Sequence, residues 1–211
     1  MTRRLAALLR CPAVLTTFSR LLIDPNRGAD DPTLIMRISD GAVVAGNARI
    51  TAEEAERRRR LYWQPYRDRV GSVLNEMQAV GPVPALVAIH SFTPAWKGHP
   101  RPWHVGILWD VDHRLAKPMI EALVADDKLV VGDNEPYDGA LEGDTMYHQG
   151  TMRGLPHMLV EIRQDLVADA AGEAAWAERL AGLLRPILAD PKLHTVKHYG
   201  TRTHSTVSSV G

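Results

Sequence analysis

The order of apolar and polar positions along the chain predicts strands that alternate with helices. Strands are predicted at residues 85–89, 104–109, 129–131 and 158–164, and shorter β-like runs at residues 13–18 and 21–23. Amphipathic helices are predicted over residues 1–10, from Thr51 to about Met77, over residues 115–125, and after Asp169. This alternation favours an α/β fold in which a mixed, mostly parallel sheet carries helices on both faces.

The helix that starts near Thr51 has clear signals at its beginning. Thr51-Ala52-Glu53-Glu54 matches a capping box, in which the threonine hydroxyl accepts from the amide of Glu54. Pro65 is expected to kink or break this helix, because proline has no amide hydrogen to donate. The four arginines at residues 57–60 are expected to form a solvated helix face; a phosphate or nucleic-acid patch is the alternative.

Three polar features fall at predicted strand ends or in the loops beside them: residues 24–27, His90-Ser91 and residues 161–165. In open α/β sheets, ligands bind outside the carboxyl ends of the strands. The long polar loops at residues 24–33 and 39–49 are further candidates for function, because functional residues concentrate on such loops.

Two residues at these strand ends could carry chemistry. His90 follows a buried strand and could point a ring nitrogen into a crevice as a metal ligand; a hydrogen-bonded structural histidine is the alternative. Glu161 stands inside the apolar run 158–162, so its carboxyl group should be buried, which is costly without a partner. Arg163 on the same strand face could be that partner; otherwise, Glu161 could act as a general base whose pKa is tuned by burial.

Asn26 and Arg27 follow the apolar run 21–23. An arginine fork with an amide donor suits a substrate carboxylate. The alternative is an Asx-type turn with an arginine that faces solvent. His194 and His198 have helical spacing but lie in a polar tail, which argues against a metal pair. The sequence has no His-Glu-x-x-His, Gly-x-Ser-x-Gly, P-loop or Gly-x-Gly-x-x-Gly motif.

Composition narrows the classes of function. The 211 residues carry 25 basic and 25 acidic side chains, so the net charge is zero, and nothing favours nucleic acid or an anionic membrane as a partner. A neutral surface allows a homo-oligomer. The single cysteine, Cys11, excludes an intrachain disulfide, and a cytoplasmic location is expected. We expect one domain over residues 1–200 and a flexible tail over residues 201–211.

The polar segments together resemble the N-formylglutamate amidohydrolase family. The resemblance rests on separated motifs in the expected order: Ser19-Arg20-Leu21-Leu22-Ile23-Asp24-Pro25-Asn26-Arg27, Ser39-Asp40-Gly41, His90-Ser91-Phe92-Thr93-Pro94, Arg101-Pro102-Trp103-His104, Gly132-Asp133-Asn134-Glu135-Pro136-Tyr137 and Gly154-Leu155-Pro156-His157 running into Glu161. It covers residues 13–200.

The resemblance implies a three-layer fold similar to the zinc carboxypeptidases and phosphorylase/hydrolase-like proteins, and a Zn²⁺ cofactor. It implies hydrolysis of a small-molecule amino-acid derivative, as in the conversion of N-formyl-L-glutamate to formate and glutamate in histidine degradation. His90 looks like a metal ligand, Glu161 like the carboxylate that activates water, and Asn26 with Arg27 like the pair that holds a substrate carboxylate.

One departure from the family pattern has consequences for the metal. The family's domain begins with a strand that ends in an Asp-His-Ala-Ser-like segment with earlier metal ligands, and this chain starts after it. A catalytic zinc site needs three protein ligands, and only His90 matches one. Either the start is misplaced and the gene product is a complete enzyme, or the chain is a non-catalytic ligand-binding remnant that lacks the first strand and a complete metal site.

Overall fold

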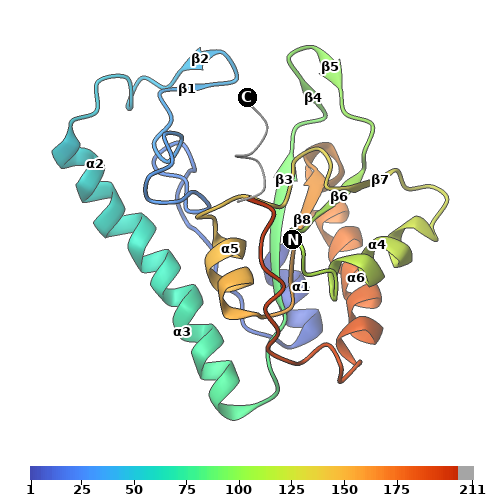
Figure 1. Cartoon of the computed structure of the whole chain (residues 1–211). Helices are drawn as coiled ribbons and strands as arrows, with labels where there is room; N and C mark the ends of the chain where they lie inside the picture. The colour runs from blue at the N-terminus through green and yellow to red at the C-terminus, as the bar shows by residue number, and fades with distance from the viewer. Residues whose placement is uncertain (204–211) are drawn as a thin grey trace, which may run out of the picture.

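The computed structural model describes residues 1–203 and shows the expected alternation of helices and strands (Figure 1). The helices are α1 (Thr2–Leu9), α2 (Ala52–Arg58), α3 (Gln64–Val80), α4 (Ala116–Val124), α5 (Thr145–Gln149) and α6 (Ala170–Leu188). The strands are β1 (Ile38–Ser39), β2 (Ala42–Val43), β3 (Leu86–Phe92), β4 (Ala95–Trp96), β5 (His99–Pro100), β6 (Val105–Leu108), β7 (Val131–Asp133) and β8 (His157–Arg163).

Four of the strands form the central sheet, in the order β3-β8-β6-β7. The pairs β3–β8 and β6–β7 are parallel, and the pair β6–β8 is antiparallel. The sheet is therefore mixed and mostly parallel, as the alternation of elements predicted. Two short hairpins, β1–β2 and β4–β5, lie outside it.

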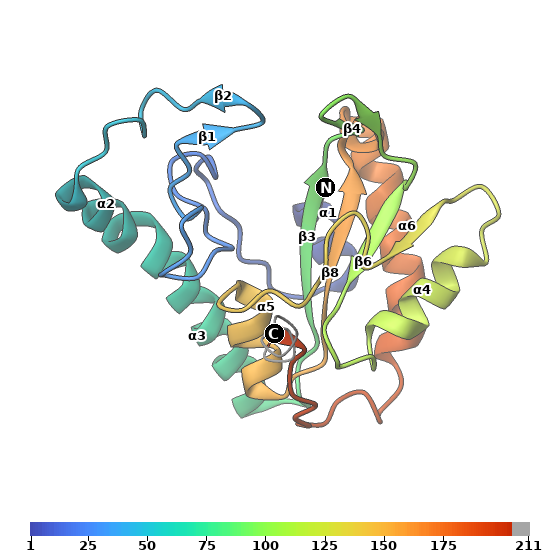
Figure 2. The ribbon, with the colours of Figure 1, turned by 45° about the horizontal axis from the view of Figure 1, so that its top comes forward.

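Helices cover both faces of the sheet (Figures 1 and 2). On one face, α1, α4 and α6 enclose the main core, where alternate residues of β8, Met158, Val160 and Ile162, pack against Leu180 and Leu184 of α6. On the other face, Leu159 of β8 packs with Met146 of α5. Because side chains alternate along a strand, Glu161 lies on the same face of β8 as Leu159. The three-layer α/β architecture is confirmed.

The region before α2 differs from the prediction. Residues 13–23 contain no strand, although their apolar pattern predicted two β-like runs. Ile23 is buried with Leu34 and Trp63 in a small cluster of its own, so its apolar character reflects packing against the π-helical segment Arg59–Trp63 and the loop, and not strand pairing. The polar loop expected at residues 39–49 begins with the β1–β2 hairpin, whose turn places Asp40 and Gly41 at positive φ.

The long helical region from Ala52 to Val80 is continuous through Pro65. A π-helical segment, Arg59–Trp63, joins α2 to α3, and the Gln64 amide bonds to the Arg59 carbonyl across this wide turn. Pro65 then occupies the first turn of α3, where no amide donor is required. A break at Pro65 is therefore wrong, and the kink that was expected as its alternative stays a prediction. The hydroxyl of Thr51 caps α2 by accepting from the Glu54 amide at 3.2 Å, as predicted.

The four arginines of this region do not form one solvated face. Arg58 is buried and donates to the Asn47 side chain at 2.7 Å and to the Leu22 and Gly46 carbonyls. Its pattern in the sequence could not reveal this role, because its partners lie in the loop that precedes the helix. Arg58 therefore ties the segment 21–47 to α2.

Three glycines allow the loop after β7 to lie against β6 and β7. A Cβ on Gly106 would stand 1.9 Å from the Glu135 carbonyl oxygen, and one on Gly132 would stand 2.6 Å from it. A Cβ on Gly139 would stand 2.1 Å from the Trp109 nitrogen. The close backbone approach fixes this loop, and with it Tyr137, beside the sheet.

The remaining elements are close to their predicted positions. Asp169 caps α6 by accepting from the Gly172 amide at 2.7 Å. Arg202, near the end of the described chain, bonds to Asp110 and Asp138. The expected boundary at residue 200 stays a prediction, and residues 204–211 of the expected tail lie outside the described residues. No helix within residues 1–203 has the length and apolar character needed to cross a membrane.

Candidate active site

The pairing of β3 with β8 brings together the two residues that the sequence singled out at strand ends. His90 is the direct neighbour of Glu161 in the parallel register. The Nδ1 atom of His90 lies 3.8 Å from Oε1 of Glu161. This distance is too long for a hydrogen bond, but a water or a substrate atom could contact both groups.

Glu161 is a buried carboxyl group with no hydrogen-bond partner in the described chain. Its exposed fraction is 5%, and its Oε2 atom is buried and unbonded. Burial raises the pKa of Glu161 to about 7, and the positive charges of Arg20 and Arg101 oppose this rise. At neutral pH the protonated and ionised forms are both populated, as a group that accepts and returns a proton requires.

The alternative partner for Glu161 is wrong. Arg163 donates to Asp165 at 2.8 Å and to the carbonyls of Pro102 and Trp103. The chain turns just after β8, and this turn places the carboxylate of Asp165 beside the guanidinium group of Arg163, where it accepts the hydrogen bond. Arg163 is therefore not the partner of Glu161.

His90 lies on the same sheet face as Glu161 and is partly buried. Desolvation lowers the pKa of His90 to about 4, with Arg20 and Arg27 acting in the same direction and Asp24 opposing them. The ring is therefore neutral at pH 7 and has a nitrogen lone pair for a hydrogen or a metal ion.

The loop before β1 is organised by Asp24, a residue to which the sequence analysis gave no separate role. Asp24 is buried, accepts from Arg20 at 2.6 Å and accepts from the Asn26 amide at 3.0 Å. The second bond forms an Asx-type turn. Such a turn was expected at Asn26, but the side chain that forms it is that of Asp24, two residues earlier. In the sequence, the position of Asp24 at the end of an apolar run was the feature that could have indicated this role.

Asn26 and Arg27 are held by their neighbours in different ways. The side-chain oxygen of Asn26 accepts from the Thr145 amide at 3.3 Å, and the carbonyl of Arg27 accepts from the Trp63 indole at 3.0 Å. The guanidinium of Arg27 lies 3.7 Å from Asp24 and makes no hydrogen bond within residues 1–203, and its Nε atom is buried. The anchored backbone thus presents a cationic group with free donors.

Asp144 is another buried carboxyl group; it lies near Arg27 and was not predicted. It caps α5 by accepting from the Tyr147 amide at 2.7 Å. Burial raises the pKa of Asp144 to about 6, while the charges of Arg27 and Arg67 oppose the rise. The neighbouring Thr145 hydroxyl is buried and unbonded among the described residues. A helix-capping pattern was the only signal for Asp144 in the sequence.

The described residues do not fit a catalytic zinc site. Within residues 1–203, no group of three His, Cys, Asp or Glu side chains could hold a metal ion. His90 and Glu161 supply two groups, one fewer than such a site needs. His194 is occupied elsewhere, since its two ring nitrogens lie 2.7 and 2.8 Å from the Val83 and Leu188 carbonyls.

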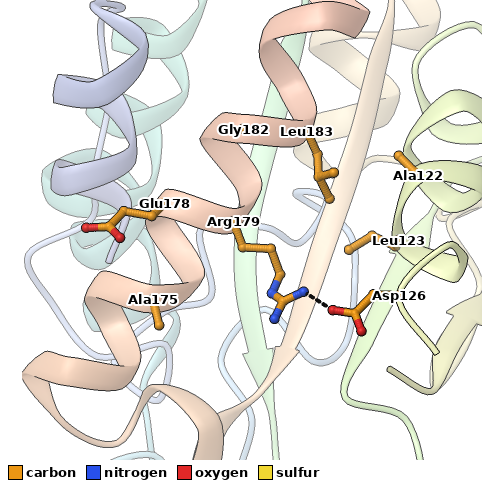
Figure 3. A pocket seen from close by; sticks show the side chains of 8 residues that line it. All are labelled: Ala122, Leu123, Asp126, Ala175, Glu178, Arg179, Gly182 and Leu183. Atoms are coloured by element: carbon orange, nitrogen blue, oxygen red, sulfur yellow. Dashed lines mark hydrogen bonds and ion pairs between the residues drawn. The ribbon is translucent and has the colours of Figure 1, made fainter. Parts of the chain in front are cut away.

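Two hollows on the surface lie away from His90 and Glu161. One, of about 480 Å³, lies between α4 and α6. Figure 3 shows that an ion pair between Arg179 and Asp126 spans it. The other, of about 590 Å³, lies against α2 and includes Asp30, Ile35 and Arg59. Neither holds an unbonded buried polar group, so the chemistry points to the β3–β8 pair instead.

Comparisons with known proteins show which proteins this chain is similar to. The family model described as N-formylglutamate amidohydrolase matches residues 1–168. A gene product from Agrobacterium tumefaciens has a crystal structure with 32% identity and a TM-score of 0.84, over 90% of this chain and 76% of that one. An N-formylglutamate amidohydrolase from Ralstonia eutropha JMP134 is 22% identical, with a TM-score of 0.63, over 89% of this chain and 85% of that one, and shows a shared fold. No curated protein matches.

Proposed function

The chain belongs to the N-formylglutamate amidohydrolase family, and on this premise we propose that it hydrolyses the amide bond of an N-acyl amino acid, with N-formyl-L-glutamate as the substrate. Family membership supports a hydrolase. The observation that carries the proposal is the carboxyl group of Glu161, which is buried and unbonded and lies 3.8 Å from a neutral histidine.

Glu161 is the proposed general base. Its carboxylate removes a proton from the attacking water as the water oxygen bonds to the acyl carbon. The carbon–nitrogen bond then breaks, and Glu161 returns the proton to the departing amine, which yields formate and the free amino acid. A pKa of about 7 suits both directions of transfer, because neither form is strongly favoured at neutral pH.

His90 and the Asn26-Arg27 pair have supporting roles in the proposal. His90, neutral and adjacent to Glu161, positions the water or the acyl oxygen. The unbonded guanidinium of Arg27 binds a substrate carboxylate. Asn26 orients this loop through its bond to Thr145 and keeps an amide group without a partner in the described chain. Such a reaction would serve amino-acid degradation.

Formate release from N-formylglutamate tests the proposal, in the presence and absence of added zinc. We expect Glu161→Gln to lower kcat by about 10²- to 10⁴-fold while circular dichroism shows an intact fold. Glu178→Gln, the same change at an exposed position of α6, is the matched control and should leave kcat unchanged. Undiminished turnover by Glu161→Gln would refute the assignment.

The incomplete metal site favours a second candidate function, a ligand-binding domain without turnover. This candidate predicts that N-formylglutamate binds, that Arg27→Met weakens binding, and that no formate is released with any added metal. Metal analysis of the purified chain separates the two candidates. One zinc per chain that a chelator removes, together with formate release, would exclude the binding-only function.

A further inference from the structure

A second arginine, Arg101, belongs to a different segment of the chain from Arg27. It belongs to the loop between the β4–β5 hairpin and β6, at the end of the sheet where β3 and β8 finish. Figure 2 shows this hairpin above β3 and β8, whereas the loop that carries Arg27 lies on the α3 side of β3. The two cationic side chains thus approach the pair from separate segments.

Aromatic rings hold the guanidinium of Arg101 in place. Its Cζ atom lies 5.1 Å from the ring centroid of Tyr137, 5.5 Å from that of Trp96 and 5.8 Å from that of Phe92. Contacts of a cation with aromatic rings within about 6 Å are attractive. Three elements, β3, β4 and the loop after β7, therefore fix this one side chain.

Only one of the three guanidinium nitrogens of Arg101 donates hydrogen bonds to residues 1–203. Nη1 donates to the Tyr137 hydroxyl at 3.0 Å, to the Thr93 hydroxyl at 3.3 Å and to the Thr93 carbonyl at 3.5 Å. Nε and Nη2 make no hydrogen bond with any residue from 1 to 203. These two nitrogens form one edge of the guanidinium plane, which matches the two oxygens of a carboxylate.

Arg101 also has no acidic side chain as an ion-pair partner within the described chain, in contrast to most arginines around it. Arg20 is paired with Asp24, and Arg163 with Asp165. Arg101 lies close to the centre of the site, because its guanidinium contacts Phe92, two residues after His90 on β3. Its charge also opposes the rise in the pKa of Glu161. Arg101 is thus a half-buried cation, held in place next to the reacting centre, and one edge of its guanidinium is free to make two hydrogen bonds. This arrangement indicates a site for an anionic group of a ligand.

We propose that Arg101 binds one carboxylate of a dicarboxylic N-acyl amino acid while Arg27 binds the other, so that the site selects substrates with two carboxylates. This inference rests on the proposed function for its substrate class. It goes further by naming the residue that discriminates a dicarboxylic substrate from its monocarboxylic analogue.

Binding of glutarate and of its monoamide, glutaramate, tests the proposal without requiring turnover. Glutarate has two equivalent carboxylates, so the result does not depend on which of them contacts Arg101. Isothermal titration calorimetry should show that the wild type binds glutarate about 10- to 100-fold more tightly than glutaramate, as expected for one charge-assisted bidentate contact. Arg101→Met should reduce this ratio to less than about threefold.

Two further variants keep the test decisive. Arg163→Met removes an arginine whose donors are already occupied by Asp165 and backbone carbonyls, and should keep the wild-type ratio. Arg101→Lys retains the charge without the fork, and should give an intermediate ratio and preserve the fold if Arg101→Met does not. An unchanged ratio in both Arg101 variants, an equal loss in Arg163→Met, or no binding of glutarate to the wild type would overturn the proposal. Arg101-dependent binding without formate release would sustain it and refute the hydrolase.

Discussion

Replacing Glu161 with glutamine should stabilise the folded chain at neutral and alkaline pH while it removes the proposed catalytic base. Glutamine has nearly the same shape as a protonated glutamic acid but carries no charge. The variant therefore removes the cost of keeping an ionised carboxyl group buried and unbonded beside His90.

The size and sign of the effect follow from the pKa of Glu161. Burial raises it from 4.5 to about 7, which corresponds to about 3 kcal/mol of unfavourable free energy in the ionised folded state. Between these two pH values the folded state holds more protons than the unfolded state, so the free energy of unfolding falls as pH rises. The full cost is present above about pH 7, and it disappears below pH 4.5.

Urea denaturation at several pH values from 4.5 to 8 measures the difference between Glu161→Gln and the wild type. The free energy of unfolding of the variant should exceed that of the wild type by about 3 kcal/mol at pH 8, and the two values should become equal at pH 4.5. The lowered pKa of His90 affects both proteins and cancels in the difference. Glu178→Gln, at an exposed position, should follow the wild type throughout. A difference that does not change with pH would refute the reasoning.

Three further changes probe other parts of the account. Arg58→Met should lower the free energy of unfolding by about 3 kcal/mol, because the Asn47 side chain and two carbonyls lose a buried charged donor. Urea denaturation measures this loss. An effect no larger than that of Arg57→Met, at the exposed neighbouring position, would contradict this role of Arg58. Gly106→Ala should lower the Tm in calorimetry, because the added Cβ would stand 1.9 Å from the carbonyl oxygen of Glu135. Gly182→Ala is the control, since no atom of the described chain lies within contact distance of a Cβ there. Equal Tm values for the two variants would show that the loop after β7 can move away without cost. His90→Gln should lose less stability than the wild type when pH falls from 6.5 to 4, since the variant lacks the His90 ring, whose folded pKa is lowered to about 4; parallel pH curves would argue that His90 is solvated.

The sheet and most helices could be predicted because their patterns are long and locally consistent. The apolar run before His90 and the period-two pattern around Glu161 each defined a strand, and Thr51 and Asp169 marked helix starts. The runs at residues 13–23 failed as strands because their apolar residues pack against helical residues instead: Ile23 against Trp63, and Val14 against Val70 and Leu74. Only tertiary structure decides this difference.

The candidate site could be predicted in its centre but not in its surroundings. His90 and Glu161 are distinguished by polar chemistry at the ends of apolar runs, and the sheet makes them neighbours. Asp144 shows only a helix-capping pattern, and Arg101 belongs to a motif of the family resemblance. Neither signal gives a position relative to Glu161, because both residues come from loops that are far from β8 in the sequence. The wrong expectations for Arg58 and Arg163 have the same origin, because their partners come from folded loops and turns.

The pH dependence of kcat/KM for formate release from N-formylglutamate tests the central claim most directly. If the buried carboxyl group of Glu161 is the base, the rate should rise with pH to a half-maximal value near pH 7 and then level off, and Glu161→Gln should lose this rise. Formate release that is flat between pH 5 and 8, or no release by the wild type with any added metal, would contradict the account.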